Sequence, residues 1–509
     1  MRSQKILWIV ALFMVIISVL PLIQMIFSSL LEQESFSKLI EIFQNPHLLK
    51  SFKNSLWLSL LVALTTSTIG LLLGILLGKS NLHFYAFFVI FLTLPLLISP
   101  YIIAYGWVEL LGHPTWLFGF WGVFMVLCSI YLPIPLLLSL FFLKQIDSHL
   151  EEVALLVGGW QKVIFGVLLP LLRPALFLSF ILVFILSFGE FSVANFLRYP
   201  IFAMESFTQF SAFYDFQMAT LTALPMIVVV FVVIILQQYL SSKYTFQFES
   251  NQNERKIELQ QWQKPLFVLL LLFSFVTVIL PLLSLLLHST TESFIIALSK
   301  AQAPLFRSFL YAFLGATLLM VFGFLNGYIL EHKIVKPTQL WEALNFFIFA
   351  LPSTVLGIAL ILFWNNPYTN IVYATPLIIL FGYVAKYLLL SSKISQINFA
   401  KIPKNIIEAT KVSGISWYKS LFFLQLPLSK SSLMLSWIVG FIFSFRELTI
   451  TMLVYPAGLE TLPIYIITQM ANGEPSVLAS LGVILVVSVV LFLILFRIIL
   501  SALADKNTS

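Results

Sequence analysis

The charged side chains that fall inside long apolar runs are the residues best placed to do chemistry in this chain. Glu190 and Glu447 each end a Ser-Phe-x-Glu sequence within such a run, and Arg446 precedes the second glutamate. A charge near the centre of a bilayer costs about 2.5–3.5 kcal/mol on insertion scales, so it is retained for a pathway or a polar contact. We therefore expect Glu190, Arg446 and Glu447 to line a route for a polar solute, or its gate. The alternative is that they satisfy hydrogen bonds between helices.

The side chains that build metal cages and covalent active sites are sparse in this sequence. The six histidines are scattered, and Cys128 is the single cysteine, so no disulfide can form within the chain. Residues 74–80 read Gly-x-x-x-Gly-Lys-Ser, which is one residue too short for a phosphate loop and lies in an apolar run. These glycines are better explained by close packing of helices. We expect no catalytic site, no metal site and no cofactor in this chain.

The composition predicts the elements that must position these charges. Of 509 residues, 60% are hydrophobic and 10% are charged, whereas a soluble domain carries about 25% charged residues. Runs of about 18 or more apolar residues are long enough to cross a bilayer as helices. We therefore predict an all-α polytopic membrane protein with about twelve transmembrane helices. Their ranges are roughly 6–31, 54–78, 85–111, 118–143, 174–198, 219–241, 265–288, 306–330, 339–364, 371–392, 431–455 and 476–500.

The basic residues predict the orientation of these helices. If the N-terminus is cytoplasmic, most lysines and arginines fall in cytoplasmic segments, as the positive-inside rule requires. An even number of spans then places the C-terminus in the cytoplasm as well. This distribution accounts for the net charge of +7 without any binding to nucleic acid. The external loops are short, so high-affinity capture of a solute outside would need a separate protein.

The chain divides into two halves that repeat each other. The polar stretch 242–264 reads as a cytoplasmic linker between a first half, 1–241, and a second half, 265–509, with six predicted helices each. Landmarks recur at a constant offset in the numbering: Pro95 with Pro352, Pro170 with Pro427, and Glu190 with Glu447. Both halves have the same predicted orientation. The pattern is typical of a duplicated and fused half that once worked as a dimer.

Two polar loops at matching places, 144–170 and 393–430, carry a shared amphipathic motif. In each, a short helix is followed by a glycine, a second helix and a Leu-Pro pair that leads back into the membrane. We expect the glycine to adopt a left-handed backbone and to end the first helix. A single copy could be an ordinary cytoplasmic loop, but two matched copies indicate that soluble partners bind them. The motif residues are Glu152, Ala154, Gly158, Leu169 and Pro170 in the first loop, and Glu408, Ala409, Gly414, Leu426 and Pro427 in the second.

On these ten residues the chain resembles the membrane permeases of binding-protein-dependent ATP-binding-cassette importers, of the type I fold. The resemblance implies that each loop is a coupling helix that docks on an ATP-hydrolysing subunit. It implies two copies of that subunit at the cytoplasmic face, an external solute-binding protein, ATP and Mg on the partner, and a bacterial inner membrane. The first loop departs from the family's Glu-Ala-Ala pattern at Val153, the second departs at Thr410, and the first is one residue shorter.

The fused halves and the Ser-Phe-x-Glu sequences resemble the ferric iron and thiamine branch of that family. Ferric iron is the leading solute, thiamine follows, and polyamines or phosphonates stay open. Two other functions are also open: a secondary transporter driven by an ion gradient, and a membrane-embedded enzyme that acts on lipid. The first needs no docking loops, and the second needs a cluster of His, Asp or Cys that the sequence lacks. The paired loops favour the importer permease.

Overall fold

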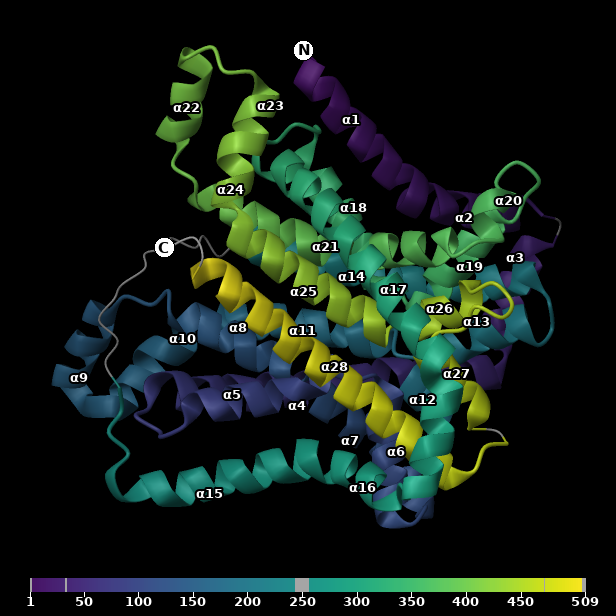
Figure 1. Ribbon diagram of the computed structural model, residues 1–509, viewed down its shortest axis with the longest axis horizontal. Coiled ribbons are helices and arrows are strands. Elements are labelled where there is room, and N and C mark those ends of the chain that lie inside the picture. The colour runs from purple at the N-terminus through teal and green to yellow at the C-terminus, as the bar shows by residue number, and fades with distance from the viewer. Residues whose placement is uncertain (1, 33, 243–255, 471, 506–509) are drawn as a thin grey trace. The chain divides into compact units, whose positions relative to one another are not determined.

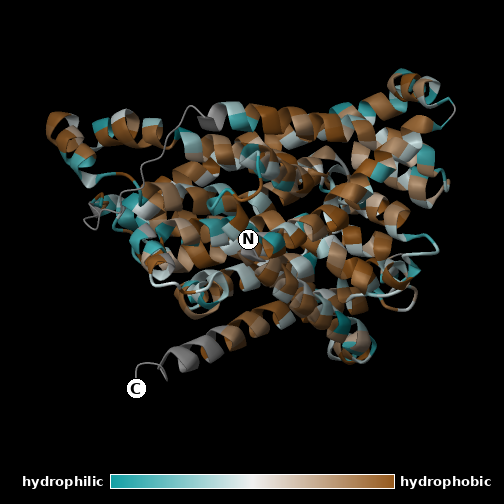
Figure 2. Ribbon diagram, turned by 90° about the horizontal axis from the view of Figure 1, so that it is seen from above, coloured by the Kyte–Doolittle hydropathy of each residue, from teal (hydrophilic) through white to brown (hydrophobic). Residues whose placement is uncertain are grey.

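The computed structural model describes residues 2–32, 34–242, 256–470 and 472–505, and helices make up almost all of it (Figure 1). Within these ranges the extended pairing is limited to one isolated bridge, between Ser80 and Ile257. Hydrophobic residues dominate the helices, while hydrophilic residues gather at helix ends and in connections (Figure 2). The predicted all-α polytopic fold is confirmed. Residues 243–255 of the predicted linker lie outside the described residues.

The described residues contain nine helices long and apolar enough to cross a membrane, or up to twelve if each of three bent pairs forms one span. The predicted number of about twelve lies at the upper end of this range. The nine are Lys5–Leu31, Pro46–Lys79, Phe120–Leu143, Ser148–Leu171, Phe216–Tyr239, Gln263–His288, Thr291–Glu331, Leu377–Lys401 and Pro475–Phe496. One of them, Ser148–Leu171, coincides with the first polar loop. Its backbone is non-helical at Gly158 and Gly159, so it consists of two pieces, each too short to span a bilayer.

Two of the predicted spans are sharply bent, which the hydropathy pattern did not predict. The expected span 85–111 is a pair, Tyr85–Leu97 and Pro100–Leu111, that meets at 101°. The expected span 339–364 is the pair α18 (Thr338–Ala350) and α19 (Ser353–Trp364), which meets at 103°. Prolines cause both breaks, because proline lacks an N–H and disfavours helical backbone in the residue before it. Pro100 starts α6 (Pro100–Leu111), and Pro352 lies between α18 and α19.

A π-helical turn precedes four Leu-Pro pairs. A proline ring in an α-helix clashes with the carbonyl four residues earlier, and a wider turn moves that carbonyl away. In each case the Leu-Pro pair begins the next helix. The turns are η1 (Val15–Val19) before Leu20-Pro21, η4 (Ile164–Leu168) before Leu169-Pro170, η6 (Phe275–Ile279) before Leu280-Pro281, and η7 (Leu421–Gln425) before Leu426-Pro427.

The helices gather into two compact units, and each unit draws on both predicted halves of the sequence. Unit 1 comprises Met1–Gln44, Glu205–Val230 and Leu298–Gly473. Unit 2 comprises Asn45–Met204, Phe231–Ala297 and Glu474–Ser509. These units describe packing in space, whereas the halves 1–241 and 265–509 describe a repeat in sequence, and that division stays a prediction.

In unit 2 the long helix α4 (Pro46–Lys79) packs against α8 (Pro133–Leu143) and α11 (Arg173–Phe188). The glycines of α4 make this contact close. A methyl group added at Gly70 would lie 2.6 Å from the Pro135 side chain, and one at Gly74 would overlap Ser139. The interpretation of these glycines as helix-packing residues therefore agrees with the structure.

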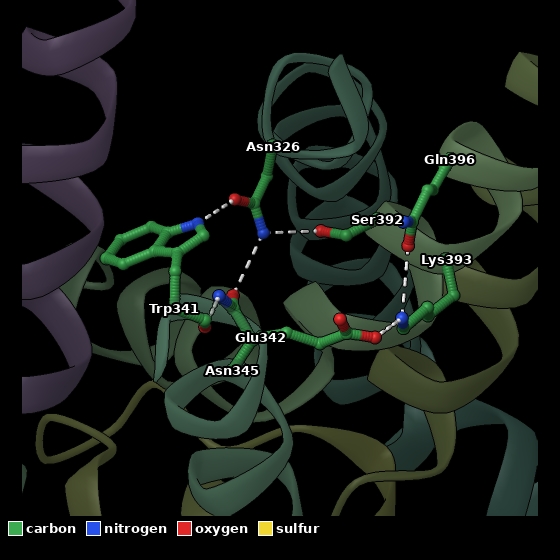
Figure 3. Close-up of polar contacts among 7 residues, drawn as sticks. All are labelled: Asn326, Trp341, Glu342, Asn345, Ser392, Lys393 and Gln396. Carbon is green, nitrogen blue, oxygen red and sulfur yellow. Dashed lines mark hydrogen bonds and ion pairs between the residues drawn. The ribbon is translucent and has the colours of Figure 1, made fainter. Parts of the chain in front are cut away.

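In unit 1 a buried polar network holds three helices together (Figure 3). Asn326 of α17 (Thr291–Glu331) is fully buried and donates to Asn345 Oδ1 and to Ser392 Oγ, both at 2.9 Å. The Trp341 indole N–H donates to Asn326 Oδ1 at 2.9 Å. Trp341 and Asn345 belong to α18, and Ser392 belongs to α21 (Leu377–Lys401). Both Nδ2 and Oδ1 of Asn326 thus have hydrogen-bond partners, as burial of a polar side chain requires.

Candidate functional site

The first polar loop is built on α9 (Ser148–Val163), in unit 2. Asp147 caps this helix, because its side chain accepts a hydrogen bond from the His149 N–H at 3.0 Å. The second loop, in unit 1, consists of α22 (Lys404–Val412) and α23 (Trp417–Ser420), which form a helical hairpin beyond the ends of α21 and α25 (Lys430–Arg446) (Figure 1). The predicted order of helix, glycine, helix and Leu-Pro is present in both loops.

The glycine prediction is right in the second loop and wrong in the first. Gly414 has a φ of +69°, in the left-handed region. Gly158 has a φ of −159°, and the left-handed backbone falls on Gly159, with a φ of +63°. The first loop has one residue fewer between its glycine and the following tryptophan, so the chain turns at the residue directly before Trp160.

This difference predicts unequal effects of alanine at the two neighbouring glycines. Alanine at 159 must adopt a left-handed backbone, which costs about 1–2 kcal/mol. Gly158 has a negative φ, and a methyl group there would lie 3.0 Å from Lys162 Cβ, so it requires only a small shift of that side chain. We expect Gly159→Ala to speed proteolytic cleavage of the loop by about 5- to 30-fold, the factor that corresponds to 1–2 kcal/mol. Gly158→Ala should cleave at nearly the wild-type rate, and Gly414→Ala serves as the matched left-handed site. Equal rates at positions 158 and 159 would contradict the assignment.

The other motif residues differ in exposure. Glu152 is partly exposed and Glu408 is exposed, so both carboxylates face outward from their helices. Ala154 is buried in an apolar cluster with Leu71 and Ile75 of α4, whereas Ala409 is exposed. Ala154 therefore packs the first loop against the membrane helices. Counted from Gly158 and Gly414, the equivalent residue of the second loop is Thr410. The pairs Leu169-Pro170 and Leu426-Pro427 follow π turns and are partly buried or exposed.

Both loops present apolar side chains that the unit to which they belong does not cover. In the first helix of each loop, Leu156 and Val412 are both 89% exposed, and they occupy equivalent positions of the repeat. Further exposed apolar residues flank them: Leu150, Val153 and Val157 in the first loop, and Ile406, Ile415 and Tyr418 in the second. Apolar patches of this kind are typical of protein–protein contacts.

The contacts that anchor the loops were not predicted from the sequence. In unit 2 Lys79 Nζ lies 2.7 Å from Glu151 Oε1, and both side chains are buried. In unit 1 the Trp417 indole N–H donates to Tyr328 Oη at 2.9 Å. Glu151 directly precedes the motif glutamate, and this adjacency was the available signal. Its partner, however, is distant in the sequence.

The glutamates in the apolar runs occupy helix breaks. Glu190 lies between α11 and α12 (Ser192–Phe196), and its Oε1 accepts from the Ser192 N–H at 2.8 Å. Glu447 lies between α25 and α26 (Thr449–Val454), and its Oε1 accepts from the Ile450 N–H at 3.0 Å. Each carboxylate thus caps the short helix that follows it.

A tyrosine contacts each of these carboxylates. The Tyr131 hydroxyl donates to Glu190 Oε2 at 3.4 Å, and the Tyr387 hydroxyl donates to Glu447 Oε2. The two tyrosines occupy equivalent places in the repeat, and that recurrence could have revealed them. Glu190 is partly exposed, whereas Glu447 is 8% exposed. The structure therefore shows the inter-helix hydrogen bonds of the alternative interpretation, and these bonds are compatible with a gate.

Unit 1 carries two buried cations that adjoin, in sequence, Glu447 and its partner Tyr387. The Arg446 guanidinium lies 5.2 Å from the centroid of the Phe443 ring. Lys386 of α21 donates to the carbonyl of Leu351, at the bend between α18 and α19. A cation at the end of a helix is favourable because the exposed carbonyls carry partial negative charge. Unit 1 therefore contains three buried ionisable groups, of which Arg446 and Glu447 lie at a helix break and Lys386 contacts a helix bend.

The family follows from comparison with known proteins. Residues 67–246 match the family described as binding-protein-dependent transport system inner membrane component. The chain is also 31% identical over 203 residues to the trehalose/maltose transport system permease protein of Thermococcus litoralis, covering 36% of this chain and 72% of that relative. This chain belongs to that family of permeases.

Longer relatives of the permease cover both of its predicted halves. A ferric transport system permease protein of Actinobacillus pleuropneumoniae is 24% identical over 520 residues, which is 94% of this chain and 75% of the relative. A putative ferric transport system permease protein of Haemophilus influenzae is 23% identical over 466 residues, which is 83% of this chain and 73% of the relative.

Family membership decides between the functions that the sequence left open. The permease is the multi-pass membrane subunit of an ATP-binding-cassette importer, so it is neither a secondary transporter nor a lipid enzyme. Its partners are an ATPase and a solute-binding protein, and ATP hydrolysis belongs to the former. Among the described residues, no group of three or more His, Cys, Asp or Glu side chains is arranged to hold a metal ion.

Proposed function

We propose that this permease imports ferric iron, delivered from outside by a solute-binding protein, across a bacterial inner membrane. The names of the full-length relatives support this solute, since they are ferric transport permeases that align over most of the chain. Thiamine is the alternative solute.

Two copies of an ATPase subunit bind at the cytoplasmic face in this proposal, one on α9 and the other on α22. ATP and Mg are held by those subunits, and both chain termini lie in the cytoplasm. The carrying observation is the equivalent, 89% exposed side chains of Leu156 and Val412. Glu152 and Glu408 lie on the same short helices, within reach of polar groups on a docked partner. The glycine turns and Leu-Pro pairs hold each helix at a fixed angle to the membrane.

The solute pathway, in this proposal, passes the helix breaks that carry Glu190, Arg446 and Glu447. This pathway is supported by a feature that occurs in both halves of the sequence. A carboxylate lies at the start of a short helix and contacts a tyrosine of a neighbouring helix. Breaks in membrane helices are tolerated where they are buried in protein or line a polar cavity. A movement that separates tyrosine from glutamate would free the carboxylate for a passing solute.

Aspartate at Leu156 or Val412 is expected to weaken binding of the ATPase subunit by about 10- to 100-fold. Burial of such a side chain is worth about 1.5–3 kcal/mol, and every 1.4 kcal/mol is a factor of ten. The measurement is titration of the purified ATPase subunit onto the permease in lipid nanodiscs. Tyr368→Asp is the control, because Tyr368 is 95% exposed in a loop predicted to be external. Undiminished binding to both loop variants would contradict the docking proposal.

The solute is tested by uptake into vesicles that contain the reconstituted permease, the ATPase subunit and the cognate binding protein. Ferric iron, offered with the binding protein, is expected to accumulate only when ATP is present. Accumulation of labelled thiamine in place of iron would reassign the substrate and leave the importer architecture intact.

A further inference from the structure

The buried ion pair between Lys79 and Glu151 connects the first loop directly to the long helix α4. Lys79 is the last residue of α4, and Glu151 lies in the first turn of α9. The exposed fractions of their side chains are 5% and 2%. Among the described residues no hydrogen-bond partner competes for the Glu151 carboxylate, so Lys79 alone compensates its charge. Separating the two would leave a buried charge uncompensated, which is strongly unfavourable.

The end of α4 is held from a second side by residues 257–259, near the end of the predicted linker. The Ile257 N–H donates to the Lys79 carbonyl at 2.6 Å, and the Asn81 N–H donates to the Ile257 carbonyl at 3.1 Å. Leu259 N–H donates to Asn81 Oδ1 at 3.1 Å. Residues 79–81 therefore contact the first loop through the Lys79 side chain, and they contact the linker segment through backbone groups and the Asn81 side chain. A displacement of residues 79–81 must therefore be shared by α4, the first loop and the linker segment.

The second loop shows that the ion pair is not needed to fold a loop of this kind. Counted from the equivalent glycines Gly74 and Gly327, His332 takes the place of Lys79; counted from Gly158 and Gly414, Ile407 takes the place of Glu151. The second loop still forms its helix, glycine turn and second helix, and it is anchored by the Trp417–Tyr328 hydrogen bond. The helix, glycine and helix order of these loops therefore does not itself require a buried ion pair at this place.

We propose that Lys79 and Glu151 are positioning residues through which movement of the first loop reaches α4. The inference rests on the coupling role proposed above for α9. When a docked ATPase subunit displaces α9, the ion pair makes α4 follow, because its low-dielectric surroundings make the attraction strong. Close packing of α4 on α8 then passes the displacement to the membrane helices. Without the pair, α9 can move on its ATPase while α4 stays in place.

The decisive variant removes both charges together, Lys79→Met with Glu151→Gln, so that no orphan charge stays buried. The complete importer in lipid nanodiscs or vesicles is expected to retain its ATPase subunit and to hydrolyse ATP, while uptake falls at least tenfold. Lys79→Arg, which keeps the charge, should retain more than half of the uptake. Uptake within twofold of wild type in the doubly neutral variant would overturn the proposal.

The control removes one lysine and one glutamate that lie outside both loops. Glu292 and Lys300 of α17 are exposed, and exposed charges contribute little to stability or geometry. Lys300→Met with Glu292→Gln is therefore expected to import at the wild-type rate. An equal loss in this control would assign the effect to loss of charge in general and overturn the proposal.

A measurement on the unaltered complex separates this inference from the proposed function and does not depend on a variant that folds. Amide hydrogen exchange in residues 76–81 is expected to change together with that in 148–157 when nucleotide binds. A change confined to 148–157 would overturn the role of the ion pair and leave docking of α9 standing. No change in either segment, or no ATPase subunit bound to the wild-type permease, would overturn the docking proposal itself.

Discussion

Glutamine in place of Glu447 is expected to lower uptake by about 10- to 100-fold without preventing the permease from folding. Glutamine can still accept the Ile450 N–H and cap α26, but it removes the charge that the Tyr387 hydroxyl contacts. A hydrogen bond to a charged group is worth about 1.5–3 kcal/mol. If the contact is present in only one state of a two-state gate, its loss shifts the balance of states by that amount.

Three further variants locate the origin of the effect. Tyr387→Phe removes the hydroxyl and keeps the carboxylate, so it should shift the same balance and match the glutamine variant. Glu190→Gln should have a smaller effect, because Glu190 is partly exposed and its tyrosine contact is longer, at 3.4 Å. Glu447→Ala also removes the helix cap and should lower the free energy of unfolding by about 1 kcal/mol. Wild-type uptake by the glutamine variant, at matched amounts in the membrane, would exclude this carboxylate from transport.

Leucine in place of Asn326 is expected to destabilise the permease by about 2–6 kcal/mol. The substitution keeps the side-chain branching at Cγ, but the Trp341 indole N–H and Asn345 Oδ1 lose their partners in a buried site. Each buried group left unsatisfied costs about 1–3 kcal/mol. Ser392 is affected less, since its hydroxyl also donates to the Leu388 carbonyl at 2.7 Å. The measurement is the free energy of unfolding of the purified protein in detergent.

A triple substitution tests whether unsatisfied polarity is the cause. Asn326→Leu combined with Trp341→Phe and Asn345→Leu removes the stranded groups, and replacement of both partners by apolar groups is nearly neutral. The triple variant should therefore recover most of the lost stability. A triple variant that is less stable than Asn326→Leu alone would show that packing, and not hydrogen bonding, holds α17, α18 and α21 together.

The parts of the fold set by composition and local sequence were predictable. Helix is the structure that satisfies backbone groups within each segment in a bilayer, so long apolar runs gave the helical elements. The repeat then directed attention to Glu190 and Glu447 and to the two polar loops. The bends at Pro100 and Pro352 were missed, because a hydropathy window measures how apolar a segment is and not where it turns.

The parts that depend on contacts between distant segments were not predictable. Lys79 and Glu151 belong to different helices, and nothing near either residue indicates its partner. Similarly, the left-handed glycine of the first loop is Gly159 because a single missing residue moves the turn. The motif predicted the turn at Gly158, the glycine that matches the family pattern, whereas the structure has it at Gly159.

The composition of the two compact units has a consequence for how such a protein could have originated. Each unit includes segments from the opposite half of the sequence: Met1–Gln44 and Glu205–Val230 in unit 1, and residues 265–297 with Glu474–Ser509 in unit 2. Two separate ancestral chains of this design would have exchanged arms, and neither would have completed its core alone. Joining them end to end raises the effective concentration of each arm at its acceptor. Gene fusion would then have favoured pairing of each exchanged segment with its acceptor in the same polypeptide over pairing with acceptors in other chains.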